Sequence, residues 1–276
     1  MPTPGTWQVR FGTAELFADD DRPAGWLLSV DRVAQSYVDL AEPTHLEFDY
    51  VRLIGDVVDC AAEPDDAVTA LHLGGGGCTV ARYIAATRPG SPQVVIEADD
   101  LLAAVVRREL GVRGFRLRVG DAREALSNVR PATSDLVVSD VFAGSELPQH
   151  CTTAEYLDEV RAVLRPGGTY IANIADGPPF GFARGQAATL RAAFDHVVLL
   201  ADPSVLRGRR FGNLVLAGSN RPFDVDELAR RSARAIGRAR VVSGDDVRDF
   251  TGGAKAVTDT TAADSPRPPP DVFRRR

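Results

Sequence analysis

The sequence predicts an α/β protein with a doubly wound, mostly parallel sheet of seven strands and one antiparallel edge strand, preceded by a small N-terminal β-hairpin module. Strand-like apolar runs alternate with helical patterns from about residue 67 to 220, which is typical of a parallel sheet covered on both faces. The first run ends in four consecutive glycines, Gly74 to Gly77, and a helical pattern follows at once. Strand, glycine turn and helix N-terminus in this order are typical of the first unit of a nucleotide-binding sheet.

The N-terminal β module is expected over residues 1–45, where short alternating runs are separated by turn residues. These runs are 7–11, 14–17 and 26–30. From Leu46 to Cys60 apolar residues recur every three or four positions, which predicts an amphipathic helix that leads into the main domain.

The main domain is expected over residues 46–220 and the strands of its sheet follow in order. They are 69–73, 93–97, 115–121, 135–140, 169–175, 196–200 and 212–218, with helices predicted over 80–86, 101–110, 152–164 and 185–194. The last two strands follow each other without a predicted helix, so they form an antiparallel hairpin. Methyltransferase-type sheets have this feature, which makes the predicted fold methyltransferase-like.

Two further segments follow the sheet. Residues 221–250 are expected to form a C-terminal helical extension that contains a helix over 224–236. Residues 251–276 are rich in Gly, Thr, Ala, Asp and Pro, a composition that predicts a disordered tail.

The composition indicates in which cellular compartment the protein is expected. Of 276 residues, 44% are hydrophobic and 25% are charged, as in an ordinary globular protein. No apolar run reaches the roughly 18 residues of a membrane span, and the N-terminus lacks the basic and apolar regions of a secretory signal. The three cysteines, Cys60, Cys78 and Cys151, are dispersed and form no disulfide pattern. We therefore expect a cytoplasmic protein with reduced thiols.

Charge and missing residue types exclude several functions. The net charge of −6 argues against non-specific nucleic-acid binding, which needs a basic face. The only lysine, Lys255, lies in the low-complexity tail, which excludes Schiff-base chemistry and a P-loop lysine. No Gly-x-Ser-x-Gly elbow is present for a serine hydrolase. The histidines lack the spacing of a metal site; they are His45, His72, His150 and His196.

Three acids stand at the carboxyl ends of successive predicted strands, where an open parallel sheet binds its ligands. Glu97 follows the glycine turn by about twenty residues, the usual position of an acid that binds ribose hydroxyls; its alternative is a solvated loop acid. Asp121 is a candidate for the exocyclic amine of adenine or for a helix N-cap, and the two roles are compatible. Asp140 would face the reactive centre beside the glycine turn, and its alternative is a structural cap.

Together these residues resemble the spermidine synthase family, aminopropyltransferases that use decarboxylated S-adenosylmethionine, from about residue 26 to 220. The family's glycine loop Gly-Gly-Gly-Asp-Gly-Gly corresponds to residues 74–79, which read Gly-Gly-Gly-Gly-Cys-Thr. The ribose acid of its Glu-Ile-Asp motif corresponds to Glu97, and its Gly-Asp-Gly adenine motif corresponds to residues 120–122. Its catalytic Asp-x-x-Asp corresponds to residues 140–143.

The resemblance implies a co-substrate, decarboxylated S-adenosylmethionine or S-adenosylmethionine, and no metal. It implies that the nucleoside is bound by Gln35, Gly74, Gly75, Gly76, Glu97, Asp121 and Ala122. Tyr50 and Asp140 are implied to bind the acceptor, and Asp140 to act as the catalytic base that takes a proton from the attacking amine. The implied partners are a small-molecule amine acceptor and a second copy of the chain in a homodimer, with no nucleic acid and no membrane.

The departures from the family pattern all concern the diamine. The loop acid is replaced by Gly77 and the second acid of Asp-x-x-Asp by Ala143, while no tyrosine follows Tyr170 in place of the family's late tyrosine. A diammonium chain buried without carboxylate partners is strongly disfavoured, which argues against putrescine as the acceptor. Glu146 lies near enough in the sequence to replace one of these acids.

Three alternatives to aminopropyl transfer stay open. The first is methyl transfer from intact S-adenosylmethionine to an unknown acceptor, which Cys78 and Thr79 would favour if the loop accommodates a methionine carboxylate. The second is a nucleoside-binding protein without turnover. A dehydrogenase is disfavoured by the antiparallel hairpin and by Thr79, which stands where a third glycine would be expected.

Overall fold

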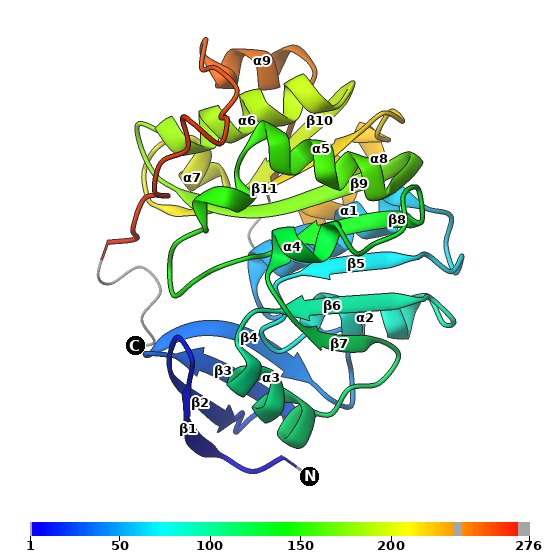
Figure 1. Ribbon diagram of the computed structural model, residues 1–276, viewed down its shortest axis with the longest axis vertical. Coiled ribbons are helices and arrows are strands. Elements are labelled where there is room, and N and C mark those ends of the chain that lie inside the picture. The colour runs from blue at the N-terminus through cyan, green and yellow to red at the C-terminus, as the bar shows by residue number, and fades with distance from the viewer. Residues whose placement is uncertain (1, 235–238, 270–276) are drawn as a thin grey trace.

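Two sheets organise the chain in the computed structural model, which describes residues 2–234 and 239–269 (Figure 1). The smaller sheet is antiparallel, with its strands in chain order: β1 (Gly5–Val9), β2 (Gly12–Ala18), β3 (Gly25–Val30) and β4 (Val33–Asp39). Asp31 and Arg32 both have positive φ and form the two-residue turn between β3 and β4, as the right-handed twist of a hairpin favours. The predicted N-terminal β-hairpins are confirmed.

The larger sheet has eight strands within the described residues, in the order β12-β10-β11-β9-β8-β5-β6-β7. They are β5 (Ala70–Leu73), β6 (Gln93–Glu97), β7 (Arg116–Val119), β8 (Ser134–Ser139), β9 (Leu164–Asp176), β10 (His196–Ala201), β11 (Gly212–Ser219) and β12 (Arg240–Ser243). Strands β9, β8, β5, β6 and β7 run parallel, whereas β11 runs antiparallel to both of its neighbours, β9 and β10. The predicted fold class, a mostly parallel α/β sheet, is confirmed.

Two details of the sheet differ from the prediction. The antiparallel strand β11 is inserted between β9 and β10 and does not lie at the edge. An eighth strand, β12, pairs antiparallel with β10 and occupies the edge instead. It lies within the segment predicted to be helical, between α8 (Val225–Arg234) and α9 (Asp245–Thr251), and its four residues are too few to show a strand periodicity in the sequence. Residues 235–236 of the helix predicted over 224–236 lie outside the described residues.

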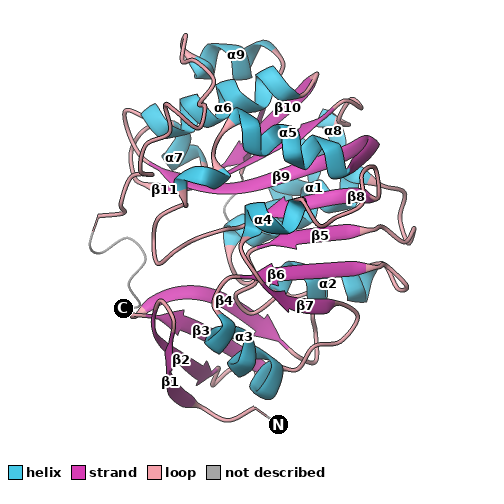
Figure 2. Cartoon of the chain, in the orientation of Figure 1, coloured by secondary structure: helices cyan, strands magenta, loops and turns pink. Residues whose placement is uncertain are grey.

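Helices cover both faces of the larger sheet (Figure 2). One face packs against α4 (Ala122–Leu126), α5 (Ala154–Val163) and α6 (Gly181–Ala193), and the other against α1 (Asp49–Ala61), α2 (Thr79–Thr87) and α8. Successive residues of β8 alternate between the two cores: Val137 joins the first, Leu136 and Val138 the second. Burial on both faces explains the nearly continuous apolar runs of these strands. Among the described helices, none is long and apolar enough to cross a membrane.

A third core joins the two sheets. It lies between the smaller sheet, α3 (Asp100–Val105) with the π-helical turn that follows it, and β6 and β7. Leu16 and Leu28 of the smaller sheet and Leu102 of α3 are buried in this core. The smaller sheet is thereby fixed below the end of the larger sheet at which β6 and β7 finish (Figure 1).

The tail, predicted to be disordered from 251 to 276, instead follows a defined path as far as residue 269. The Val257 carbonyl accepts from the N–H of Ala154 at the start of α5, and Ser265 Oγ accepts from the N–H of Leu147 at 2.8 Å. Ser265 is only 3% exposed. Low-complexity composition predicts few apolar contacts, but it does not reveal that polar groups of the tail have specific partners on α5 and on the loop before it. Residues 270–276 lie outside the described residues.

Candidate active site

A cavity of about 710 Å³ lies between β3–β4 of the smaller sheet and the carboxyl edge of the larger sheet. This is the edge at which open α/β sheets bind their ligands. Every residue that the sequence predicts for the site lines this cavity: Gln35, Tyr50, Gly74, Gly75, Gly76, Glu97, Asp121, Ala122 and Asp140. The fold therefore brings together residues from six separate segments of the chain, and their roles toward a ligand are taken up below.

The glycine loop between β5 and α2 is held tightly by the rest of the protein. Gly74 has a φ of +89°, and a Cβ there would overlap the carbonyl oxygen of Asp140. Gly76 has a φ of +45°, and its Cβ would lie 2.6 Å from Ser36 Oγ. Both positions require glycine, because left-handed backbone with such close neighbours does not accommodate an L side chain.

The fourth glycine of the loop, Gly77, stands where the resemblance predicts an acid. A Cβ on Gly77 would lie 2.9 Å from Val38 Cγ2 and 3.0 Å from Ser36 Cβ, both in β4. The N–H of Gly77 donates to Ser36 Oγ at 2.9 Å, which fixes the loop against this strand. Strand β4 therefore occupies the space that an acidic side chain at position 77 would need.

Glu97, the last residue of β6, accepts three backbone hydrogen bonds. Its Oε2 accepts from the N–H groups of Gly75 and Gly76, each at 3.0 Å, and its Oε1 accepts from the N–H of Asp99 at 2.9 Å. Burial raises the pKa of Glu97, although these N–H groups oppose the shift. A carboxylate has about four acceptor positions, so Glu97 ties the glycine loop to β6 and keeps one position for a ligand.

Asp121 caps α4 and also contacts a histidine. Its Oδ1 accepts from the N–H groups of Arg123 at 2.8 Å and Glu124 at 3.0 Å, and its Oδ2 lies 2.9 Å from His150 Nε2. Burial acts to raise the pKa of Asp121, but the N–H of Glu124 and the ring of His150 outweigh it, so that the pKa is lowered. The helix-cap role of Asp121 is confirmed, and its second oxygen faces the cavity beside His150.

Asp140, directly after β8, is held by two side chains. Asn173 Nδ2 donates to its Oδ1 at 2.8 Å, and the Tyr50 hydroxyl donates to its Oδ2 at 3.4 Å. Asn213 Nδ2 donates to Asn173 Oδ1 at 3.0 Å and so orients the first amide. Burial raises the pKa of Asp140 against the lowering effect of Asn173 and Tyr50. A carboxylate with a raised pKa is a stronger base than an exposed one, which suits proton abstraction.

Three further polar residues line the cavity although no sequence motif predicts them there: Asn173, Asn213 and His150. Asn173 is 2% exposed within the apolar run of β9, and a buried amide in such a run is a usable signal. Asn213 reaches the same edge of the sheet because β11 is antiparallel, so that its first residues meet the last residues of β9. His150 lies in a 3-10 turn (Gln149–Cys151) without any motif of its own.

Three suggestions about replacement residues are not supported by the geometry. Glu146 forms a β-bridge with Ala143, but its carboxylate binds Arg267 at 2.5 Å, and it is not among the described residues that line the cavity. Cys78 and Thr79 also lie outside the cavity lining, and the Thr79 hydroxyl donates to a carbonyl of β4 at 2.9 Å. Both residues line a separate cavity of about 30 Å³ beside Asp140, which is too small for a ligand.

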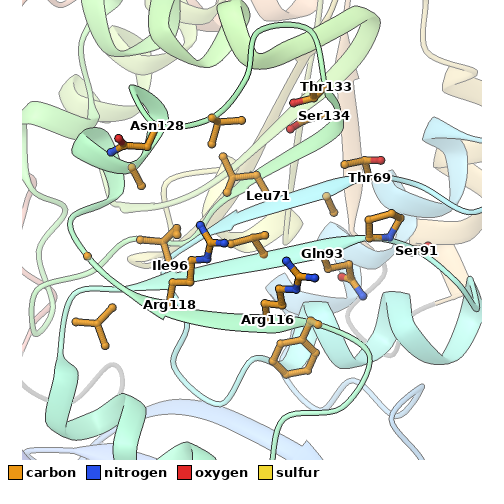
Figure 3. A pocket seen from close by; sticks show the side chains of 18 of the residues that line it. Thr69, Leu71, Ser91, Gln93, Ile96, Arg116, Arg118, Asn128, Thr133 and Ser134 are labelled. Carbon is orange, nitrogen blue, oxygen red and sulfur yellow. The ribbon is translucent and has the colours of Figure 1, made fainter.

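A second cavity of about 1000 Å³ lies on the exposed face of β5, β6 and β7, beside α4 (Figure 3). Arg116 and Arg118 extend from the edge strand β7 across this cavity, and Thr133 and Ser134 lie on its opposite side. Asp121 lines both cavities, whereas Glu97, Asp140 and the glycine loop line the first and not the second, so the three acids and the loop are combined in the first cavity. In residues 2–234 and 239–269, no group of His, Cys, Asp and Glu side chains is placed to hold a metal ion.

Two relatives of similar sequence are both named polyamine aminopropyltransferase. No protein-family model matches the sequence. The polyamine aminopropyltransferase of Vibrio vulnificus is 28% identical over 108 residues, which are 37% of this chain and 36% of that protein. The polyamine aminopropyltransferase of Chromobacterium violaceum is 27% identical over 143 residues, 50% of this chain and 53% of that protein. The matches thus span between about a third and about half of the length of these relatives.

Solved structures extend the comparison to nearly the whole chain. Human methyltransferase-like protein 13 in complex with SAH is 17% identical, with a TM-score of 0.51 over 77% of this chain and 92% of that one. A spermidine synthase in complex with the transition-state analogue AdoDATO is 14% identical, with a TM-score of 0.56 over 93% of this chain and 81% of that one. At these identities the likeness shows the fold alone, and it confirms the methyltransferase-like sheet.

A structure at higher identity decides the family. The probable spermidine synthase from Corynebacterium glutamicum is 35% identical to this chain, with a TM-score of 0.89. The match covers 94% of this chain and 97% of that one, so it includes the smaller sheet as well as the larger one. Identity at this level over nearly the full length of both chains shows that the protein belongs to the spermidine synthase-like family.

Proposed function

We propose that this chain is a transferase that binds decarboxylated S-adenosylmethionine and moves its aminopropyl group to the nitrogen of an amine. The observation that carries the proposal is the Asp140 carboxyl, which burial makes more basic and which faces the cavity beside the glycine loop. The names of the relatives, polyamine aminopropyltransferase and probable spermidine synthase, support the same class of reaction.

In this proposal the nucleoside lies along the edge of the sheet, from the end of β7 to the end of β8. The adenine amine donates to Asp121, next to Ala122, and the ribose hydroxyls donate to the free acceptor position of Glu97. Gln35 of β4 covers the nucleoside from the smaller sheet. The binding of AdoDATO and of SAH by proteins with this fold supports an adenosyl ligand in this cavity.

The acceptor arrives as an ammonium ion, since an alkyl amine has a pKa of roughly 10. Asp140 takes one proton from its nitrogen, and the lone pair then attacks the carbon bonded to the sulfonium sulfur. The C–S bond breaks with its electron pair on sulfur, a C–N bond forms, and the positive charge moves from sulfur to nitrogen as the thioether nucleoside leaves. Tyr50 and Asn173 hold the base in position, because they donate to different oxygens of the carboxylate.

Calorimetric titration with decarboxylated and with intact S-adenosylmethionine, each followed by a small amine and by analysis of the nucleoside product, tests the proposal. We expect tighter binding of the decarboxylated donor and release of methylthioadenosine together with an aminopropylated amine. A preference for intact S-adenosylmethionine with S-adenosylhomocysteine as product would replace aminopropyl transfer by methyl transfer. Binding of a donor without any product would leave a nucleoside-binding protein, and no binding of either donor would overturn the site.

A further inference from the structure

Two charged residues outside the predicted site line the cavity at its far end, Asp202 and Arg210. Asp202 follows β10, and Arg210 lies in the turn that leads into β11. From Asp140 at the end of β8, the sheet order continues through β9 and β11 to β10, away from the strands that carry Glu97 and Asp121. These two residues therefore lie on the side of Asp140 opposite to the proposed nucleoside, where an acceptor would extend.

The distance along this edge suits a short chain. Neighbouring strands are about 4.8 Å apart, so the start of β11 lies roughly 10 Å from the end of β8. Arg210 Nη1 is placed near this start, since it lies 3.5 Å from the position that a Cβ on Gly212 would take. A four-carbon chain with a hydrogen bond of about 2.8 Å at each end bridges a gap of this size.

The hydrogen bonds at this end leave a surplus of donors. Asp202 Oδ1 accepts from the N–H of Ser204 at 2.6 Å and from its hydroxyl at 2.5 Å, and Asp202 Oδ2 faces Arg210 Nη2 at 3.4 Å. Arg210 Nε donates to Ser204 Oγ at 2.7 Å, while Nη1 has no hydrogen-bond acceptor among the residues that the structure describes. Asp202 Oδ1 is thus occupied and its Oδ2 is paired with Arg210, while the half-exposed guanidinium of Arg210 has free N–H groups.

If the acceptor were a diamine, its second ammonium group would find no free carboxylate among the following acids. The two family acids are replaced by Gly77 and Ala143, and Glu146 is bound to Arg267 outside the cavity lining. Two other cavity acids, Glu47 and Asp49, precede or begin α1, where they are largely exposed and pair with His45 at 3.1 Å and Arg52 at 3.1 Å. The far end of the acceptor would therefore meet the ion pair of Arg210 and Asp202, in which the guanidinium still has N–H groups without an acceptor.

We propose, on the basis of the function proposed above, that the acceptor is an amine whose far end carries a carboxylate, and that Arg210 is the residue that binds this carboxylate. The amine nitrogen lies at Asp140, and the carboxylate accepts hydrogen bonds from the free N–H groups of Arg210. A guanidinium and a carboxylate form charge-assisted hydrogen bonds of favourable geometry, whereas a guanidinium repels a second ammonium group.

A matched series of four-carbon amines tests this inference: n-butylamine, putrescine and 4-aminobutyrate, which end in a methyl, an ammonium and a carboxylate group. Their affinities are measured by calorimetry on the protein saturated with methylthioadenosine, so the result does not depend on turnover. We expect 4-aminobutyrate to bind about 10- to 100-fold more tightly than n-butylamine, and putrescine to bind most weakly. Putrescine as the tightest ligand of the wild-type protein would overturn the inference and would favour Glu47 or Asp49 as its partner.

Variants of the turn identify the residue responsible. Arg210→Met, which keeps length and removes charge, should abolish the preference for 4-aminobutyrate, and Arg210→Glu should reverse it in favour of putrescine. Arg209→Met is the matched control, since Arg209 is the exposed neighbour outside the cavity lining, and it should leave the preference unchanged. An unchanged preference in Arg210→Met would overturn the assignment.

The carboxylate could instead belong to the donor, and a separate titration decides this. If Arg210→Met weakens the binding of intact S-adenosylmethionine but not that of 4-aminobutyrate, Arg210 binds the methionyl carboxylate and the acceptor inference is overturned. Failure of the proposed function is recognised differently, by the absence of methylthioadenosine release with every amine. The order of amine affinities is still informative in that case, so the two failures are distinguishable.

Discussion

The two halves of the cavity hold their carboxylates in different ways. In the half that we propose to bind the nucleoside (the nucleoside half), Glu97 accepts from three backbone N–H groups and Asp121 from two. In the half that we propose to bind the acceptor (the acceptor half), Asp140 accepts from two side chains, Tyr50 and Asn173. Backbone donors are fixed by the path of the chain, whereas side-chain donors are lost with a single substitution.

This difference separates the acids that we propose to bind the nucleoside from the acid that we propose to take part in the reaction. The backbone contacts of Glu97 and Asp121 depend on the glycine loop and on the start of α4, and they do not involve the residues around Asp140. Under the proposals above, a nucleoside site fixed by backbone groups and an acceptor site built from side chains such as Arg210 would allow one reaction to be directed to a different amine.

The largest expected effect is on turnover, through Asp140→Asn. If Asp140 is the base, turnover should fall by about 10²- to 10⁴-fold, the usual contribution of general-base catalysis. Nucleoside affinity should change little, because the contacts of Glu97 and Asp121 do not involve Asp140. Single-turnover release of the thioether nucleoside and calorimetry measure the two quantities separately. Asp176→Asn, at the end of the neighbouring strand β9 and outside the cavity lining, is the control; an active Asp140→Asn would remove Asp140 as the base.

The next effect concerns the nucleoside half, through Glu97→Ala. The variant should bind methylthioadenosine with a free energy weaker by about 1–3 kcal/mol, the cost of losing hydrogen bonds to a charged group. Loss of the loop contacts of Gly75 and Gly76 also weakens binding, so affinity alone does not identify a ribose contact. The 2′,3′-dideoxy analogue resolves this, because wild-type protein should discriminate against it and Glu97→Ala should not. Equal discrimination in both proteins would restrict Glu97 to holding the loop.

A smaller effect is expected in the pH dependence, through Asn173→Ala. The hydrogen bond from Asn173 lowers the pKa of Asp140 and partly offsets the rise caused by burial. Its removal should raise the pKa of Asp140 further, so the carboxyl stays protonated to higher pH and the acidic limb of kcat/KM should move to higher pH. Asn213 acts on Asp140 only through its hydrogen bond to Asn173, so Asn213→Ala should shift the acidic limb of kcat/KM less. A limb that moves to lower pH in Asn173→Ala would contradict the role of Asp140 as the titrating base.

These contrasts also explain what could be predicted from the sequence. Glu97, Asp121 and Asp140 stand directly after apolar runs, and the carboxyl ends of parallel strands meet at one edge, so their convergence follows from sequence order. Arg210 and Asn213 could not be placed in this way, because they precede or begin a strand whose direction and position in the sheet depend on tertiary pairing with β9.

The tail shows that composition, too, is a limited guide to structure. Glycine, proline and small polar residues predict disorder because they bury little apolar surface. In the structure, single polar contacts replace that surface: Asp259 binds Arg123 through both oxygens, at 2.8 and 3.0 Å, and accepts from Thr153 at 2.6 Å. Such pairs join residues more than 100 positions apart, so no local sequence pattern predicts them.

The smallest effect on ligand binding is expected from Asp259→Ala. This variant tests whether the two halves of the cavity bind their ligands independently. Arg123 follows Ala122 in the first turn of α4 and also binds Glu159 at 2.8 Å, a contact that does not involve Asp259. An ion pair with an exposed partner contributes little, so the affinity for methylthioadenosine should fall less than about fivefold and the preference among the three amines should not change. Calorimetry with the same ligands measures both, and Asp264→Ala, which removes another tail carboxylate, is the control.

The stability of Asp259→Ala should depend on pH with a defined sign. Arg123, and then Thr153, lower the pKa of Asp259 to about 2, below the value of about 3.9 for an aspartate in an unfolded chain. A carboxyl whose pKa is lower in the folded than in the unfolded chain stabilises the folded state at pH values above its unfolded-state pKa. This contribution is lost as the pH falls toward 2. The urea midpoints of variant and wild type should therefore differ at pH 7 and converge in acid. A changed amine preference in this variant would instead mean that the tail couples the two halves, because it contacts α4 through Asp259 and the loop after Asp140 through Ser265.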